Sequence, residues 1–101
     1  MVNILEAARY LVYLSYEKKK YSLTPLKLQK LLYLAQGWSY VWDNQAAFPE
    51  DFCAWQYGPV NEMVYEAFKK YGRSEIPASE GISDIADKDV EDTLEAVWLE
   101  Y

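Results

Sequence analysis

The chain has 101 residues, the size of one small domain, and 51% of them are apolar. This composition argues against disorder, and no apolar run reaches the roughly 20 residues that a membrane-spanning helix needs. The N-terminus shows no basic flank leading into an apolar block, so no signal peptide is expected. A lone cysteine, Cys53, excludes an internal disulfide and fits the cytoplasm, where we expect the protein to be.

Charge is divided unevenly along the chain, whose net charge is −6. Residues 1–42 carry six Lys or Arg against two Glu (+4), whereas residues 43–101 carry four against fourteen acidic residues (−10). The net acidity disfavours general binding to a phosphate backbone. A basic first half would suit an acidic partner, but solvated helix faces explain the same pattern more simply.

The first helix is predicted over residues 4–18, because Asn3 and Glu6 resemble a capping box and apolar residues then recur at helical spacing. Lys18, Lys19 and Lys20 fall where the last carbonyls of that helix concentrate negative potential. Stabilisation of the helix end explains them at least as well as a binding patch does. The short connection over residues 21–23 predicts that the next helix runs antiparallel to the first.

The densest apolar segment, residues 23–42, predicts a second helix at the centre of the fold. Thr24 can cap its start, and Pro25 suits the first turn because its missing N–H would be unpaired there anyway. Its apolar residues cover more than one stripe: Leu26, Leu28, Leu31, Leu32, Leu34, Ala35 and Trp38. A narrow solvent-exposed strip is left to Lys27, Gln29, Lys30, Gln36 and, less strictly, Tyr33. Such a helix needs neighbours on more than one side.

Helical periodicity stops after Trp42, and residues 43–57 predict a connector with one short β-hairpin. Gly58 and Pro59 are interpreted as the N-cap and first position of a third helix. Its buried face is predicted at Val60, Met63, Val64, Ala67, Phe68 and Tyr71, and Gly72 is predicted to end it. The amides at such a helix start could hold an anion or a carboxylate of a partner.

Residues 73–86 are polar and predict a loop held by Ile76, Ile82 and Ile85. Asp87 then caps a last helix with an apolar stripe made of Val90, Leu94, Val97, Trp98 and Tyr101. The predicted fold is therefore mainly α. It is a single small helical domain over residues 1–101, with about four helices and an irregular connector or short β-hairpin between the second and third.

The residues available for chemistry argue against an enzyme. The chain has no histidine, which removes Ser-His and Cys-His catalysis and most zinc sites. Cys53 has no base beside it in the sequence, and no glycine-rich phosphate loop is present. The acidic residues around Asp87 lack calcium-loop spacing, and Glu62 with Glu66 has no supporting feature. We expect no catalytic residue, no cofactor and no metal.

Two segments together resemble a known family. KLQKLLY (residues 27–33), followed by Gln36-Gly37-Trp38, and AWQYGPV (residues 54–60) occur in the order and separation typical of the Panacea domain. That family includes the phage-associated SocA-like and GepA-like antitoxin proteins. Either segment alone would be a weak signal. The resemblance extends from Asn3 to Trp98 and is thinnest over residues 73–87.

The resemblance implies a helical antitoxin that neutralises a cognate protein toxin by direct contact, with no membrane involved. It also implies an alternative, an adaptor that delivers the toxin to an ATP-dependent protease. A third hypothesis is a DNA-binding regulator of its own operon that uses the lysines at 18–20, 27 and 30, but the apolar helix and the net charge oppose it. The predicted partner-binding residues are Lys27, Lys30, Trp38, Trp55, Tyr57, Gly58 and Pro59. The simpler alternative to partner binding is that residues 55–59 form a structural corner that seats the third helix and that Lys27 and Lys30 are solvated.

One departure from the family concerns the last helix. Family members usually continue into a further helical segment with a Thr-His and Pro-Trp signature, whereas this chain stops at Tyr101, as a truncated piece or a short variant would. We therefore expect Val97, Trp98 and Tyr101 to lack part of their cover. An exposed apolar surface at the C-terminal helix would favour a homodimer.

Overall fold

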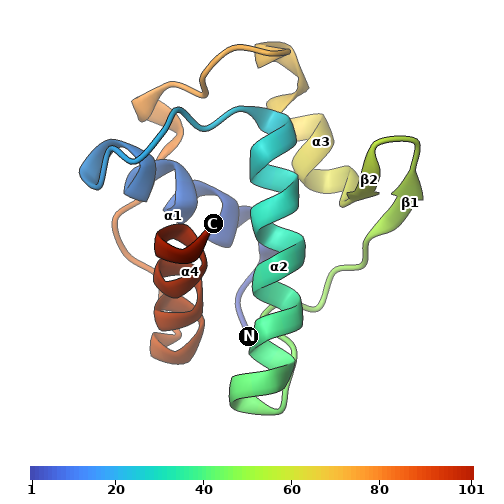
Figure 1. The fold of residues 1–101 in the computed structure, drawn as a ribbon, viewed down its shortest axis with the longest axis vertical. Coiled ribbons are helices and arrows are strands. Elements are labelled where there is room, and N and C mark those ends of the chain that lie inside the picture. Colours follow the sequence, from blue (N-terminus) through green and yellow to red (C-terminus); the bar gives the residue numbers. More distant parts are fainter.

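The computed structural model describes all 101 residues as four helices and one β-hairpin (Figure 1). The helices are α1 (Ile4–Glu17), α2 (Pro25–Asp43), α3 (Glu62–Phe68) and α4 (Lys88–Glu100). Strands β1 (Cys53–Trp55) and β2 (Gly58–Val60) pair antiparallel between α2 and α3, and short 3₁₀ helices cover Lys69–Tyr71 and Ala78–Glu80. The mainly helical fold class is confirmed. None of these helices has both the length and the apolar content needed to cross a membrane.

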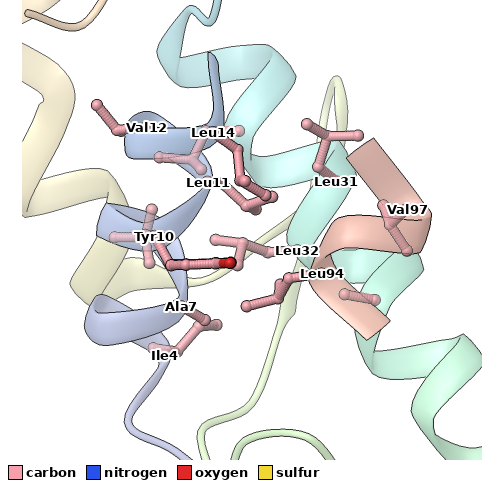
Figure 2. Close-up of a cluster of buried hydrophobic side chains, with 14 of the residues drawn as sticks. Ile4, Ala7, Tyr10, Leu11, Val12, Leu14, Leu31, Leu32, Leu94 and Val97 are labelled. Atoms are coloured by element: carbon pink, nitrogen blue, oxygen red, sulfur yellow. The ribbon is translucent and has the colours of Figure 1, made fainter. Parts of the chain in front are cut away.

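The central position predicted for α2 is confirmed. Thr24 caps the helix by accepting a hydrogen bond from the Lys27 N–H at 3.4 Å, and Pro25 occupies the first turn. The helix contacts α1, α3, α4 and β2. Figure 2 shows Leu31 and Leu32 of α2 in one cluster with side chains of α1 and α4. Its outer face, however, leaves Leu26 half exposed, although the apolar pattern predicted it to be buried.

The antiparallel neighbour of α2 is α4 and not α1. Trp38 of α2 donates from Nε1 to the Tyr101 hydroxyl at 2.9 Å, whereas Trp42, one turn further on, lines a hollow with Asp92 near the start of α4. Figure 1 shows α1 running across this pair. The predicted antiparallel arrangement of α1 and α2 was wrong, although the two helices do contact each other. The connection spans residues 18–24, and this longer link lets the chain turn across α2.

The third helix begins later than predicted. Gly58 and Pro59 belong to β2, and Asn61 is the N-cap, accepting the Val64 N–H on its side-chain oxygen at 3.0 Å. The prediction of a Gly58-Pro59 helix start was wrong, because Gly58 has a φ of +118° that serves the hairpin, and only Asn61 offers an acceptor to the free first-turn amides. The anion site suggested at that start is therefore wrong as well. Met63, predicted to be buried, is exposed.

The last helix is covered better than expected. Asp87 caps it as predicted, accepting the N–H groups of Asp89 and Val90. Its apolar stripe packs into the core, and only Tyr101 of that stripe is exposed. Val97 and Trp98 do not lack cover, because residues before α2 close over them: the Tyr21 ring lies 4.5 Å from the Trp98 ring. Lys20 donates to the Leu99 carbonyl at 2.6 Å, so it stabilises the end of α4 and not that of α1.

The loop over residues 73–86 is fixed by a polar cluster in addition to the buried Ile76. Glu80 accepts hydrogen bonds from Arg9 at 2.5 Å and from the Tyr71 hydroxyl. The Tyr71 hydrogen bond, and then the Arg9 guanidinium, hold the pKa of Glu80 below its ordinary value of 4.5. Lys70 adds a longer ion pair at 3.8 Å. The loop, α1 and the segment after α3 are therefore joined through one carboxylate.

Because the pKa of Glu80 is lower in the folded state, this carboxylate stabilises the fold fully above pH 4.5 and loses that contribution as the pH falls through its folded value. We expect Glu80→Gln to lower the free energy of unfolding at pH 7 by about 1–3 kcal/mol. The variant should also show a shallower loss of stability between pH 5 and pH 3. Urea denaturation at several pH values measures both. Glu75→Gln, at an exposed residue, is the control, and equal acid profiles for the two variants would contradict the prediction.

Candidate partner-binding surface

A buried glutamine of α2 holds the hairpin and the start of α3. The Gln29 side chain accepts the Asn61 backbone N–H at 2.9 Å and donates to the Asn61 carbonyl at 3.1 Å. The Asn61 side chain in turn donates to the Asp51 carbonyl at 2.7 Å. Gln29 is only 5% exposed, so its placement in a solvent-exposed strip was wrong. A polar side chain is stable at this buried position because both of its hydrogen-bonding groups are satisfied by backbone.

A second glutamine, seven residues further along the same face of α2, fixes the start of the connector. Gln36 donates to the Phe48 carbonyl at 2.8 Å and accepts the Ala47 and Phe48 N–H groups at 2.8 and 3.2 Å. Phe48 is thereby held in the core. Gln36 is partly buried and lines a hollow on the surface, so its predicted place in the solvent-exposed strip is correct only in part. The two glutamines attach both ends of the segment that carries the hairpin to one rigid helix.

The turn of the hairpin depends on Gly58. Trp55 pairs with Gly58, and Gln56 and Tyr57 form the two-residue loop between them. The φ of +118° at Gly58 is one that residues with a side chain rarely adopt, although a Cβ there would meet no atom within 4 Å. Backbone conformation, and not space, therefore requires glycine at this position. The turn presents Tyr57 at its tip, where it is 75% exposed.

The hairpin forms one wall of an apolar groove of about 450 Å³. Trp55, Gln56 and Tyr57 line it on the hairpin side, and Pro25 and Leu26 line it on the α2 side. The remaining lining residues are Gln29, Val60, Val64, Tyr65, Lys69 and Gly72. Figure 1 shows the hairpin projecting from the molecule next to α3, on the side of the N-terminal half of α2.

Aromatic contacts give the groove a defined shape. The Trp55 ring meets the Tyr65 ring edge-on, with centroids 4.9 Å apart. The Lys69 ammonium lies 5.9 Å from the centroid of Tyr65 and forms an exposed ion pair with Glu66 at 2.8 Å. The hydrogen bond to Glu66 raises the pKa of Lys69, so its positive charge at the groove edge persists at neutral pH. The groove is thus lined mainly by apolar surface, with the Lys69–Glu66 ion pair at one edge.

The structure brings together only two of the predicted partner-binding residues in this groove, Trp55 and Tyr57. Gly58 and Pro59 shape the hairpin without lining the groove. Lys27 is partly buried with its ammonium 5.0 Å from the Tyr21 ring centroid, and Lys30 is exposed on α2 beside the groove residue Gln29. Trp38 lies at the other end of α2, stacked on Trp42 with ring centroids 5.0 Å apart.

Comparison with known proteins identifies the family. A sequence model described as the antitoxin SocA-like Panacea domain matches residues 28–99, well over half of the chain. The chain belongs to this Panacea domain family. Searches of curated proteins and of solved structures gave no match. The matched segment contains α2 from Leu28 onward, the hairpin, α3 and α4 up to Leu99, so both glutamines and the whole hairpin lie within the family region.

Several groove residues of this Panacea domain were not predicted as site residues from its sequence. Leu26 was assigned to the core. Tyr65 and Lys69 belong to the residues that resemble the family but were not predicted to bind the partner. The spacing of Gln29 and Gln36 did carry a signal, since two glutamines seven residues apart lie on the same face of a helix. Gln29 on that face is buried and Gln36 is partly buried, and amides at such positions need hydrogen-bond partners.

The cysteine and the acidic residues of this Panacea domain are held in structural contacts. The Cys53 thiol donates to the Glu62 carboxylate at 3.3 Å, and this hydrogen bond raises the pKa of the thiol, which disfavours the reactive thiolate. The acidic residues at the start of α4 are engaged in capping and in ion pairs, such as Lys88 with Asp92 at 2.7 Å. No three potential ligand side chains gather in a metal-binding arrangement.

We expect Gln29→Ala to destabilise the Panacea domain by about 2–4 kcal/mol, because it leaves a buried N–H and a buried carbonyl of Asn61 without partners. Urea denaturation gives this value. Gln45→Ala is the matched control, since Gln45 is exposed, and it should change stability by less than about 0.5 kcal/mol. Equal effects of the two substitutions would contradict the role assigned to Gln29.

Substituting two glycines by alanine should change the free energy of unfolding in opposite directions. Gly58→Ala should cost about 1–2 kcal/mol because alanine is strained at the positive φ of the turn. Gly37→Ala, in the middle of α2 with open space at its Cβ, should instead stabilise by about 0.5–1 kcal/mol. Both are measured by urea denaturation at low micromolar protein. If both substitutions changed the stability in the same direction, the conformational role of Gly58 would be contradicted.

Proposed function

We propose that this protein is an antitoxin that neutralises a cognate protein toxin by binding it through the groove between the hairpin and α2. Membership of an antitoxin-like family supports this function at the family level. The observation that favours the groove as the binding surface is the exposed pair of large aromatic residues on its hairpin wall. Trp55 is 41% exposed and Tyr57 is 75% exposed, although both are carried by a firmly attached turn.

The physical properties of the groove suit a protein ligand. Aromatic side chains presented on a rigid support lose little conformational entropy on binding, and residues of this kind dominate binding energy in protein interfaces. The volume of about 450 Å³ accommodates one or two apolar side chains of a partner. Lys69 at the edge, and Lys30 beside Gln29 on α2, would favour acidic residues next to that apolar anchor.

In this proposal the protein acts by occupying the toxin and performs no catalysis of its own. The absence of histidine and the hydrogen-bonded thiol of Cys53 agree with a binding role. We propose the cytoplasm as its location, since a single partly buried cysteine needs no oxidising compartment.

Co-expression with the product of the adjoining gene tests the proposal. The wild-type protein should restore growth to cells that produce the toxin, and the double variant Trp55→Ala, Tyr57→Ala should fail to do so. Purified toxin should bind this variant at least about 30-fold more weakly, the size of effect that loss of a binding hot spot produces. Met63→Ala is the control, because Met63 is an exposed apolar residue outside the groove.

The level of toxin in the same cells separates two mechanisms. Neutralisation by masking predicts that the toxin persists in a complex with its partner. Delivery to an ATP-dependent protease predicts that toxin disappears faster when this protein is present. If the adjoining gene product is harmless, or if the double variant rescues growth as well as the wild type, the proposed function is wrong.

A further inference from the structure

A second exposed apolar surface lies at the opposite end of α2 from the groove. It encloses a hollow of about 570 Å³ lined mainly by Tyr33, Gly37, Trp38, Tyr40, Val41 and Tyr101. Tyr40 is 56% exposed and Val41 is 68% exposed, and neighbouring Trp42 is half exposed. We call this surface, made of Tyr33, Gly37, Trp38, Tyr40, Val41, Trp42 and Tyr101, the C-terminal face of α2. The proposed toxin groove uses none of its residues.

Charge sets this face apart from the rest of the molecule. No Lys, Arg, Asp or Glu occurs over residues 33–42, although the protein has 26 charged residues among 101 and a net charge of −6. Two copies of an acidic protein repel each other unless they meet where neither presents charge. The side chains that line the hollow on the C-terminal face of α2 carry no charge, and acidic residues, Asp43, Asp89 and Asp92, border the face only at Trp42. Approach of a second copy is therefore less opposed over the hollow.

Gly37 at the centre of this face is not explained by the fold of one chain. It lies within a regular helix, although glycine has a low helix propensity. A Cβ built on it would meet no atom within 4 Å. Neither a turn nor internal packing therefore requires glycine here. A missing side chain on an exposed helix does allow the backbone of another helix to approach closely. Tyr33 and Tyr40, one turn before and one turn after Gly37, could then pack on either side of such a crossing.

The face is also held in a fixed shape before anything binds. Trp38 donates to the Tyr101 hydroxyl at 2.9 Å and stacks on Trp42, so α2 and the end of α4 form one continuous surface. Since a fully covered aromatic side chain buries 150–250 Å², the half-exposed residues here offer roughly 500 Å² per copy. Two copies would bury roughly 1,000 Å², the lower limit for a specific interface.

From these observations we infer that the C-terminal face of α2 is a homodimer interface, in which α2 of one copy crosses α2 of a second copy at Gly37. A two-fold axis at the crossing places the same uncharged patch on both sides, as such an interface requires. The modest area is at the lower limit for a specific interface, so we expect a weak dimer that forms only at high micromolar protein concentration. The toxin groove, at the other end of α2, stays accessible in this dimer.

Sedimentation equilibrium of the full chain tests the inference. The wild type should be mainly dimeric at about 200 µM and mainly monomeric at about 1 µM. Val41→Glu, which places charge on the face, should weaken association at least tenfold. Met63→Glu is the matched control at an exposed apolar residue elsewhere and should leave association unchanged. A monomer at 200 µM, or equal effects of the two substitutions, would overturn the inference.

Disulfide trapping tests the crossing point itself. In a Cys53→Ser background, Gly37→Cys should form a covalent dimer under mild oxidation, because cysteines can be bridged only when their Cα atoms lie within about 7 Å. Lys30→Cys lies about two turns from the crossing on the same face of α2 and should remain unlinked. Efficient linking at position 30, or none at position 37 in a chain that sediments as a dimer, would overturn the crossing at Gly37. Circular dichroism confirms that each variant is folded.

Discussion

The paired hydrogen bonds between the Gln29 side chain and the Asn61 backbone are the contact on which the binding surface depends. They join α2 to the point where the hairpin ends and α3 begins. The Gln29 side chain forms the two hydrogen bonds that a neighbouring strand would otherwise form. A two-stranded hairpin has only marginal stability by itself, and this contact supports it from α2. Gln36 repeats the arrangement at the start of the connector. The segment between them can therefore present Trp55 and Tyr57 without burying them.

Helix α2 serves two structural purposes with different faces. Its inner face combines leucines that pack against α1 and α4 with the two glutamines that hold the connector. Its outer face carries exposed apolar residues at both ends, Leu26 at the groove beside the hairpin and Tyr40 with Val41 at the C-terminal face of α2. Because the core is built by the inner face alone, substitutions on the outer face should change binding with little effect on folding. Under the proposed function, stability and recognition would be separated on one helix.

The positions of the lysines in the fold differ from what the distribution of charge along the sequence suggested. The excess of positive charge in the first half of the chain suggested a basic surface for an acidic partner. In the structure Lys20 caps the end of α4, and Lys27 lies over the Tyr21 ring, so both have intramolecular roles. The cation at the edge of the groove is Lys69, which comes from the acidic half of the chain. Surface charge is thus a property of the folded arrangement and not of sequence intervals.

The sequence by itself determined the elements whose signals are local. The Thr24-Pro25 start of α2, the Asp87 cap of α4 and the stripe that includes Leu94 and Trp98 follow from capping chemistry and helical periodicity, which involve only neighbouring residues. The motif pair also identified the family. Tertiary structure decided that Gln29 and Gln36 pair with backbone groups of distant residues, that α4 and not α1 is antiparallel to α2, and that Gly58 belongs to a hairpin. Each of these depends on contacts between residues far apart in the chain. From the sequence alone a glutamine is predicted to be exposed, because its amide group needs hydrogen-bond partners. The backbone groups that satisfy these two glutamines come close to them only in the folded chain.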